Sequence, residues 1–168
     1  MGLREWDLKY SEMDAEEAPE PTPLVVRAVE GIAPGRALDL ACGAGRDAVW
    51  LAEHGWAVTA VDGSRAGIEI VKRRSAKVDA RVADLEKHEF VVEAGAWDLI
   101  LMIRYLQRDL FDEVKRGVVA GGVVVAVALM GESRFSVAPG ELRGQFEGWE
   151  ILHSAEGKLA EIVARRPA

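Results

Sequence analysis

The sequence is poor in the residues that build disulfides and metal centres. Cys42 is the single cysteine among 168 residues, which excludes an intramolecular disulfide. No histidine lies near it in the sequence, so Cys42 is more simply a small residue after a strand than a nucleophile. The three histidines are scattered, at positions 54, 88 and 153, and form no metal-ligand spacing. No metal site is predicted.

Long apolar runs are also missing. The longest run, residues 118–130, contains two glycines and is shorter than the roughly 20 residues that a membrane-spanning helix needs. The N-terminal stretch lacks the apolar segment of a secretory signal peptide. We therefore expect no membrane partner and a cytoplasmic location. Hydrophobic residues make up 49% of the chain, which is enough for one sizeable core.

Positive charge is scarce and unevenly distributed. Residues 1–20 contain seven acids and two bases, a net charge of −5, so the other 148 residues carry only −2. Nucleic-acid-binding proteins need clustered lysine and arginine, and no nucleic-acid partner is predicted. We expect an acidic N-terminal arm over residues 1–20 and a single domain over residues 21–168. The arm is either a mobile, solvated terminus or a lid.

Strand and helix patterns alternate along the body of the chain. Apolar runs predict strands, and apolar stripes at helical spacing predict helices. The expected strands are 36–41, 56–61, 77–83, 97–103 and 122–130, and the expected helices are 23–31, 46–54, 64–74, 107–117 and 140–146. Residues 149–154 and 158–165 resemble an antiparallel pair. This order predicts an α/β fold, a Rossmann-like doubly wound sheet that is mostly parallel with an antiparallel C-terminal edge hairpin.

A glycine turn and an acid mark a candidate nucleotide site. Gly43 and Gly45 follow the first predicted strand and open a helix, where a missing Cβ permits positive φ and close ligand approach. The same residues fit the dinucleotide pattern G-x-G-x-x-A, and a purely structural turn is a third reading. Asp62 ends the second strand, where an acid can accept hydrogen bonds from ribose hydroxyls.

Three further features separate the nucleotide-binding classes. Asp39 places a charge inside the first strand, shortly before the glycines. Asp84 follows the third strand, where it can accept from an exocyclic amine of adenine, with Leu85 beside the ring. The chain also leaves no room for the substrate domain that a dehydrogenase usually carries. Together these features favour a nucleoside ligand other than a nicotinamide dinucleotide.

The run from Asp39 to Gly45 resembles the first motif of the class I S-adenosylmethionine-dependent methyltransferases, with Ala41 where glycine is commonest. Residues 97–100 and 120–122 resemble further motifs of this class. Within the class, the likeness is strongest to small enzymes of the tellurite-resistance type, and residues 6–10, 38–51, 139–142 and 147–150 carry it. The resemblance implies S-adenosylmethionine as cofactor and methyl transfer as activity.

The resemblance also implies a set of site residues. The expected cofactor-binding residues are Trp6, Tyr10, Asp39, Ala41, Gly43, Gly45, Arg46, Asp62, Gly63, Ser64, Asp84, Leu85 and Ile103. Arg104 and Tyr105 follow the fourth strand, without a histidine or acid beside them. They either hold and orient an anionic acceptor, which makes them the expected catalytic residues, or serve as an ion-pair partner and a packing residue.

The absence of a general base there favours a small acceptor that is already nucleophilic, such as a thiol, a chalcogen oxyanion or a small acid. We expect a monomer or homodimer. Two alternatives stay open, an NAD(P)-dependent oxidoreductase and a non-catalytic module that binds S-adenosylmethionine. A further expectation is that Gly45→Val harms cofactor binding more than folding, because the Cβ branch would enter the space of the ligand.

Overall fold

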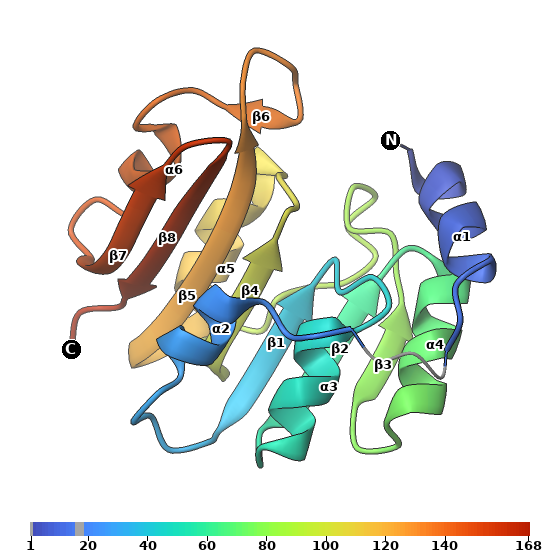
Figure 1. Ribbon diagram of the computed structural model, residues 1–168. Helices are drawn as coiled ribbons and strands as arrows, with labels where there is room; N and C mark the ends of the chain where they lie inside the picture. Colours follow the sequence, from blue (N-terminus) through green and yellow to red (C-terminus); the bar gives the residue numbers. More distant parts are fainter. Residues whose placement is uncertain (1, 16–18) are drawn as a thin grey trace. The chain divides into compact units, whose positions relative to one another are not determined.

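Strands and helices alternate along the chain in the order that the apolar patterns predict. The computed structural model describes residues 2–15 and 19–168. Two compact units make up the chain, Met1–Val91 and Val92–Ala168, which are called the first and the second unit (Figure 1).

The first unit is built on three parallel strands. They are β1 (Arg36–Leu40), β2 (Ala57–Asp62) and β3 (Asp79–Val82), in the order β3-β2-β1. Leu40 pairs with Val61, and Asp62 pairs with Val82, so the three strands end at the same edge (Figure 1). This edge carries the loops in which the glycine turn and the predicted acids lie.

Four helices accompany this sheet, α1 (Leu3–Ser11), α2 (Pro23–Ala28), α3 (Arg46–Glu53) and α4 (Arg65–Arg74). The side of α3 that carries Ala48 and Leu51 is buried, and so is the side of α4 that carries Ile68 and Val71. Burial of one apolar stripe is what holds such short helices in place, because isolated helices of this length are marginal in water.

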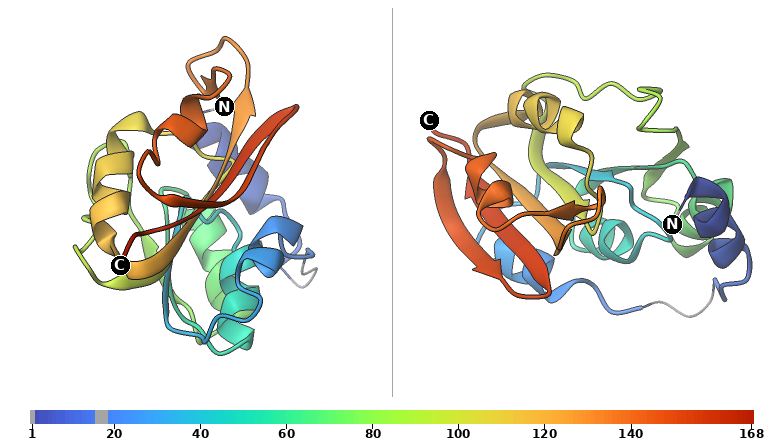
Figure 2. Two further views of the ribbon diagram at one scale, coloured as in Figure 1. Left: turned by 90° about the vertical axis from the view of Figure 1, so that its left-hand side faces the viewer. Right: turned by 90° about the horizontal axis from the view of Figure 1, so that it is seen from above.

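The N-terminal arm contains a helix that was not predicted. Residues 3–11 form α1, which contacts α4 (Figure 2). Glu16 and Glu17 of the predicted arm lie outside the described residues. The division into an arm of residues 1–20 and one domain of residues 21–168 stays a prediction.

The second unit contains the C-terminal strands β4 (Trp97–Ile103), β5 (Val118–Met130), β6 (Ser136–Val137), β7 (Glu150–Glu156) and β8 (Leu159–Arg165). Strands β4 and β5 are parallel, β6 makes a short parallel pair with the end of β5, and β8 joins β5 to β7 in antiparallel fashion. The antiparallel C-terminal edge is therefore confirmed, and with it the predicted mixed α/β fold class (Figure 1). The two-residue strand β6 is too short for a periodic signal and was not predicted.

The helical segments of this unit are η1 (Arg108–Leu110), α5 (Phe111–Gly117) and α6 (Glu141–Gly144). The predicted helix over residues 107–117 is thus split into a short 3-10 turn and an α-helix. Phe111 packs edge-on against Phe146, with ring centroids 6.0 Å apart, and both rings are fully buried. Across residues 2–15 and 19–168, no helix has the length and apolarity needed to cross a bilayer.

Candidate active site

The glycine turn between β1 and α3 has an unusual backbone. Gly43 and Gly45 have φ values of 56° and 83°, and Ala41 has a φ of 59°. The N–H of Gly45 donates to the carbonyl of Cys42, at 3.0 Å, and the N–H of Cys42 donates to that of Val61, at 3.0 Å. Left-handed backbone favours glycine, which explains the two glycines but leaves Ala41 strained.

Asp62 binds this turn from the end of β2. Its Oδ2 accepts the N–H of Gly43 at 2.9 Å, and its Oδ1 accepts the N–H of Ser64 at 2.8 Å. Burial raises the pKa of Asp62, while the hydrogen bonds from Ser64 and Gly43 oppose this shift. A carboxylate has about four acceptor sites, so each oxygen retains one for a ligand hydroxyl.

Ser64 begins α4 as predicted, and its hydroxyl links the helix to the N-terminal arm. The N–H of Gly67 donates to Ser64 Oγ at 3.0 Å, which is a side-chain N-cap. Ser64 Oγ in turn donates to Asp7 Oδ1 at 2.7 Å, and the N–H of Ala66 donates to the same oxygen at 3.0 Å. These hydrogen bonds lower the pKa of Asp7, so its carboxylate docks α1 on the start of α4.

Asp7 was missed as a site residue by sequence reasoning. It lies inside the Trp-Asp-x-x-Tyr element, between the two aromatic residues that were predicted. The element that contains Asp7 was therefore recognised, but one acid among the seven of the arm does not stand out in the sequence. Its partners, the Ser64 hydroxyl and the N–H of Ala66 at the start of α4, are brought to it only by the fold.

Tyr10 lies against the glycine turn. A Cβ on Gly43 would overlap the Tyr10 hydroxyl, and a Cβ on Gly67 would lie 3.2 Å from its ring. Burial is the main cause that raises the pKa of Tyr10, and the charge of Asp62 adds to it. Trp6 is more exposed and stacks on Tyr10, with 5.5 Å between the ring centroids. The Lys9 Nζ lies over the Trp6 ring, 4.7 Å from its centroid. Tyr10 is thus brought to the predicted site, while Trp6 stays near the surface.

Gly45 faces the protein interior. A Cβ at this position would lie 2.7 Å from Val71 Cγ2 and 3.5 Å from Val49 Cγ2. The reason given for the expected effect of Gly45→Val, a Cβ that enters the space of the ligand, is not the contact found, because the Cβ would meet Val71 on α4. We therefore expect this substitution to harm folding as well. Gly63 is similar, since its Cβ would lie 2.9 Å from the Leu3 side chain.

Two further acids, Asp39 and Asp47, are buried, and the charges of Asp47 and Asp62 both act on Asp39. Asp39 is 4% exposed, and burial raises its pKa well above the usual range, with the charges of Asp47 and Asp62 adding to the shift. Asp47 accepts the N–H of Thr22 at 2.7 Å and its hydroxyl at 2.9 Å. The same setting, with burial first and Asp39 next, raises the pKa of Cys42 well above its usual range, so its thiol stays protonated.

The remaining predicted residues of the first unit differ in exposure. Asp84 is half-buried after β3, and its Oδ1 accepts the N–H of Glu86 at 3.0 Å, which closes a local turn. Leu85 is 5% exposed. Arg46 is exposed at the first position of α3. The first unit therefore joins Tyr10, Gly43, Asp62 and Ser64 by direct contacts, with Asp84 at the end of the neighbouring strand.

Ile103 ends β4 in the second unit, and Arg104 and Tyr105 follow it. Arg104 is exposed, has a φ of 56°, and donates its N–H to the carbonyl of Val127 at 2.7 Å. The Tyr105 hydroxyl donates to Gln107 Oε1 at 2.6 Å. Within the described part of the chain, the Arg104 guanidinium has no acidic partner at ion-pair distance. A strained backbone that presents a charged side chain to solvent is typical of a functional position.

The strain at Ala41 gives a first testable prediction. Ala41→Gly should raise the free energy of unfolding by up to about 1 kcal/mol, because the relief of left-handed strain exceeds the added entropy of the unfolded chain. Urea unfolding followed by circular dichroism measures this change. Ala44→Gly, in the same turn but at a position without a positive φ, is the control and should lower stability. A loss of stability in Ala41→Gly would show that the φ at this position carries no strain.

Comparisons with known proteins agree with this fold. The family model of the tellurite resistance protein TehB matches residues 10–163. The crystal structure of TehB from Haemophilus influenzae has a TM-score of 0.77 and 23% identity, and covers 86% of this chain and 62% of that chain. A TehB-like S-adenosylmethionine-dependent methyltransferase from Corynebacterium glutamicum has a TM-score of 0.70 and 18% identity, and covers 99% of this chain and 98% of that chain. At these identities the two structures establish the fold.

One curated relative is similar over a shorter region. The ribosomal RNA small subunit methyltransferase C of Alcanivorax borkumensis is 44% identical over 52 residues, which are 29% of this chain and 16% of the relative. The chain thus spans less than two thirds of this relative and of the H. influenzae protein. Since the family model covers most of the chain, the protein belongs to the TehB family of tellurite resistance proteins, and its resemblance to the class I S-adenosylmethionine-dependent methyltransferases is confirmed.

Proposed function

We propose that this protein transfers the methyl group of S-adenosylmethionine to a small, soft or anionic acceptor. The observation that carries the proposal is the hydrogen-bonded unit of Asp62 and the glycine turn. Asp62 is held by the backbone N–H groups of Gly43 and Ser64, and both of its oxygens retain acceptor capacity. Two adjacent ribose hydroxyls are donors that suit these two oxygens.

Other residues of the first unit suit the remaining parts of this cofactor. Helix α3 begins directly after Gly45, and the first N–H groups of a helix are unpaired donors that can bind a carboxylate. Asp84 retains Oδ2 for an adenine amine, because its Oδ1 accepts from Glu86. Burial raises the pKa of Asp39 and Asp62, and a ligand that carries positive charge, as a sulfonium and an amino group do, favours the ionised forms of both acids.

A nicotinamide dinucleotide is the second candidate, on the strength of the G-x-G-x-x-A pattern. The same acids disfavour it, because a pyrophosphate and above all a 2′-phosphate would bring negative charge toward Asp62 and Asp39. A binding module without catalysis is the third candidate, and it would share the ligand of the first. Ligand binding therefore distinguishes a methyltransferase from a nicotinamide-dependent enzyme. Turnover distinguishes a methyltransferase from a binding module without catalysis.

Methyl transfer requires little covalent chemistry from the protein. S-adenosylmethionine supplies an electrophilic methyl carbon, and the electron pair of the broken C–S bond stays on a sulfur that becomes a neutral thioether. The contribution of the chain is to position the acceptor and exclude water. Arg104 is proposed to hold an anionic acceptor, and Tyr105, whose hydroxyl is oriented by Gln107, to contact it. An acceptor that is a nucleophile at neutral pH needs no base.

We propose in addition that α1 forms a lid. Trp6 and Tyr10 lie on this helix, and Tyr10 contacts the glycine turn. Asp7 holds the helix to Ser64, the N-cap residue that follows Asp62 by two positions. Contacts at both the glycine turn and the end of β2 place the helix beside the residues proposed to bind the ribose.

Arg104→Ala should lower the rate of methyl transfer at least about tenfold and leave the affinity for S-adenosylhomocysteine within about twofold. The reason is that the guanidinium contacts the acceptor and not the nucleoside. Steady-state kinetics with the best acceptor and calorimetry with S-adenosylhomocysteine measure the two effects. Arg143→Ala removes another exposed arginine of the second unit, on α6, and should be fully active. Full activity of Arg104→Ala would remove this residue from the acceptor site.

The proposed function is tested in two steps. Thermal shift with S-adenosylhomocysteine, NAD and NADP should show stabilisation by the first ligand alone. A methyl-transfer screen against thiols, chalcogen oxyanions, small carboxylates and RNA then identifies the acceptor class. Transfer to a thiol or oxyanion supports the proposal, and transfer to RNA alone contradicts the small-acceptor part. Binding without transfer to any member of a broad panel favours the non-catalytic module.

A further inference from the structure

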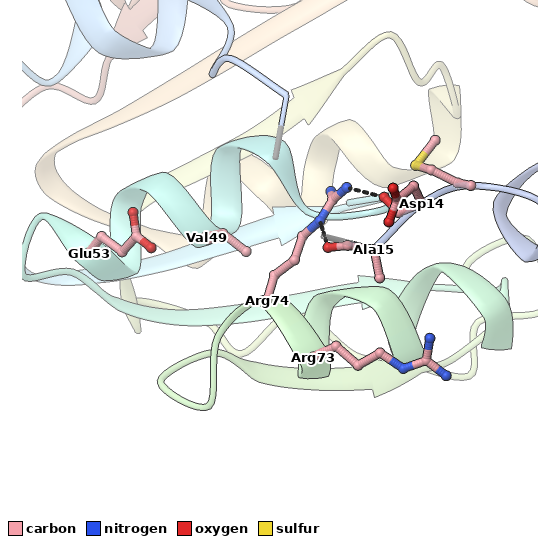
Figure 3. A pocket seen from close by; sticks show the side chains of 7 residues that line it. Asp14, Ala15, Val49, Glu53, Arg73 and Arg74 are labelled. Atoms are coloured by element: carbon pink, nitrogen blue, oxygen red, sulfur yellow. Dashed lines mark hydrogen bonds between the residues drawn. The ribbon is translucent and has the colours of Figure 1, made fainter. Parts of the chain in front are cut away.

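Arg74, the last residue of α4, joins three backbone carbonyls from two distant segments. Its Nη1 donates to Ala44 in the glycine turn at 2.9 Å. Its Nε and Nη2 donate to Ala15 at 3.2 Å and to Asp14 at 3.3 Å, in the segment that follows α1 (Figure 3). A planar guanidinium with five donors is suited to such a fork.

The neighbouring Arg73 shows that this arrangement is specific. Three basic residues end α4, and their position alone indicates a favourable interaction with the helix dipole. Arg73 and Arg74 both line an open pocket of about 750 Å³. Arg73 is exposed and points away from Asp14 and Ala15, whereas Arg74 is half-buried and reaches toward them (Figure 3).

The bond to Ala44 fixes the orientation of a peptide group in the glycine turn. The carbonyl of Ala44 and the N–H of Gly45 belong to the same peptide, and this N–H already donates to Cys42. Both polar atoms of the peptide are thereby bound. Gly43, which precedes it, is the residue that contacts Tyr10 and Asp62. Arg74 therefore holds the turn from one side while it holds the end of the arm from the other.

We infer that Arg74 is a positioning residue that couples docking of the N-terminal arm to the conformation of the glycine turn. The part concerning the cofactor rests on the proposed function. Because one guanidinium binds both segments, an ordered turn favours a docked arm, and a docked arm favours the ordered turn. By linkage, a ligand that orders the turn also strengthens docking of the arm, by the same factor by which the arm strengthens its binding.

Hydrogen exchange of the full-length, ligand-free protein tests the coupling directly. The variants are Arg74→Lys, which keeps the charge but not the fork, and Arg74→Gln, with Arg73→Gln as matched control. Both Arg74 variants should exchange faster at residues 4–12, at least about fivefold, with unchanged exchange in β1 and β2. Arg73→Gln should match the wild type. An Arg74→Lys variant with wild-type exchange in the arm overturns the inference.

A double-mutant cycle tests the link to the cofactor. In calorimetry with S-adenosylhomocysteine, Arg74→Gln should weaken binding at least about fivefold in the wild-type background. The Tyr10→Ala substitution already releases the arm from the turn. In that background, Arg74→Gln should weaken the binding of S-adenosylhomocysteine by less than about a further twofold. Equal effects in the two backgrounds overturn the inference. A wild-type protein that does not bind S-adenosylhomocysteine overturns the proposed function instead, while the exchange experiment still tests the coupling.

Discussion

Asp62→Ala should weaken the binding of S-adenosylhomocysteine at least about tenfold. The substitution removes the acceptor for the ribose hydroxyls, and hydrogen bonds to a charged group contribute roughly 1.5–3 kcal/mol. It also removes the partner of the N–H groups of Gly43 and Ser64, so the turn itself loses its order. Both effects act in the same direction. Calorimetry on the folded variant measures the change in affinity.

A matched variant separates this effect from a general loss of acidic charge. Asp79 lies on the adjacent strand β3, is exposed, and pairs with Arg81 at 2.7 Å. Asp79→Ala removes the same charge but only a surface ion pair, which contributes little to stability. It should leave the affinity unchanged. Unchanged affinity in a folded Asp62→Ala variant would contradict the assignment of the ribose site.

Gly45→Val should lower the free energy of unfolding by about 2–6 kcal/mol. Left-handed backbone at a residue other than glycine costs on the order of 1–3 kcal/mol. Forcing the branched side chain against Val71 costs about 1–3 kcal/mol more, because both sides of the contact are buried. This is a large part of the stability of a domain of this size. Urea unfolding measures the loss.

Gly43→Ala is the informative comparison, because the two glycines face different neighbours. Its Cβ would overlap the Tyr10 hydroxyl on α1, a side chain that can move with its helix. The variant should therefore lose less stability than Gly45→Val and should release the arm, seen as faster exchange at residues 4–12. If Gly45→Val unfolds at the wild-type urea concentration, the close packing of the turn on α4 is contradicted.

The sequence predicts most of the fold because its elements are separated by strong local signals. The strand at residues 97–103 was predicted with the bounds that the structure shows, since it is apolar at every position but Asp98 and begins two residues after Gly95. The helix predicted over residues 64–74 is found as α4, with Ser64 as its N-cap. The helix of the N-terminal arm was not predicted, because its stability comes from Asp7 and Tyr10 contacting residues more than 30 positions away.

The candidate site is predictable only where a residue type is itself a signal. A glycine pair after a strand and an acid at the end of the next strand point to a nucleotide, whatever else the fold does. Arg74 has no such signal, since a basic residue at a helix end is common. Gly45 is the opposite case, because the sequence signal is strong but misleading. A glycine in a binding motif suggests a ligand, whereas a Cβ at Gly45 would face Val71. Which neighbour a glycine serves depends on three-dimensional packing.

Titration of S-adenosylhomocysteine into the full-length protein by calorimetry tests the central claim most directly. Asp62, the glycine turn and the start of α3 together predict saturable binding of one ligand per chain, with no heat of binding for NAD or NADP under the same conditions. Absence of binding by S-adenosylhomocysteine, or saturable binding of NAD in its place, would contradict the claim.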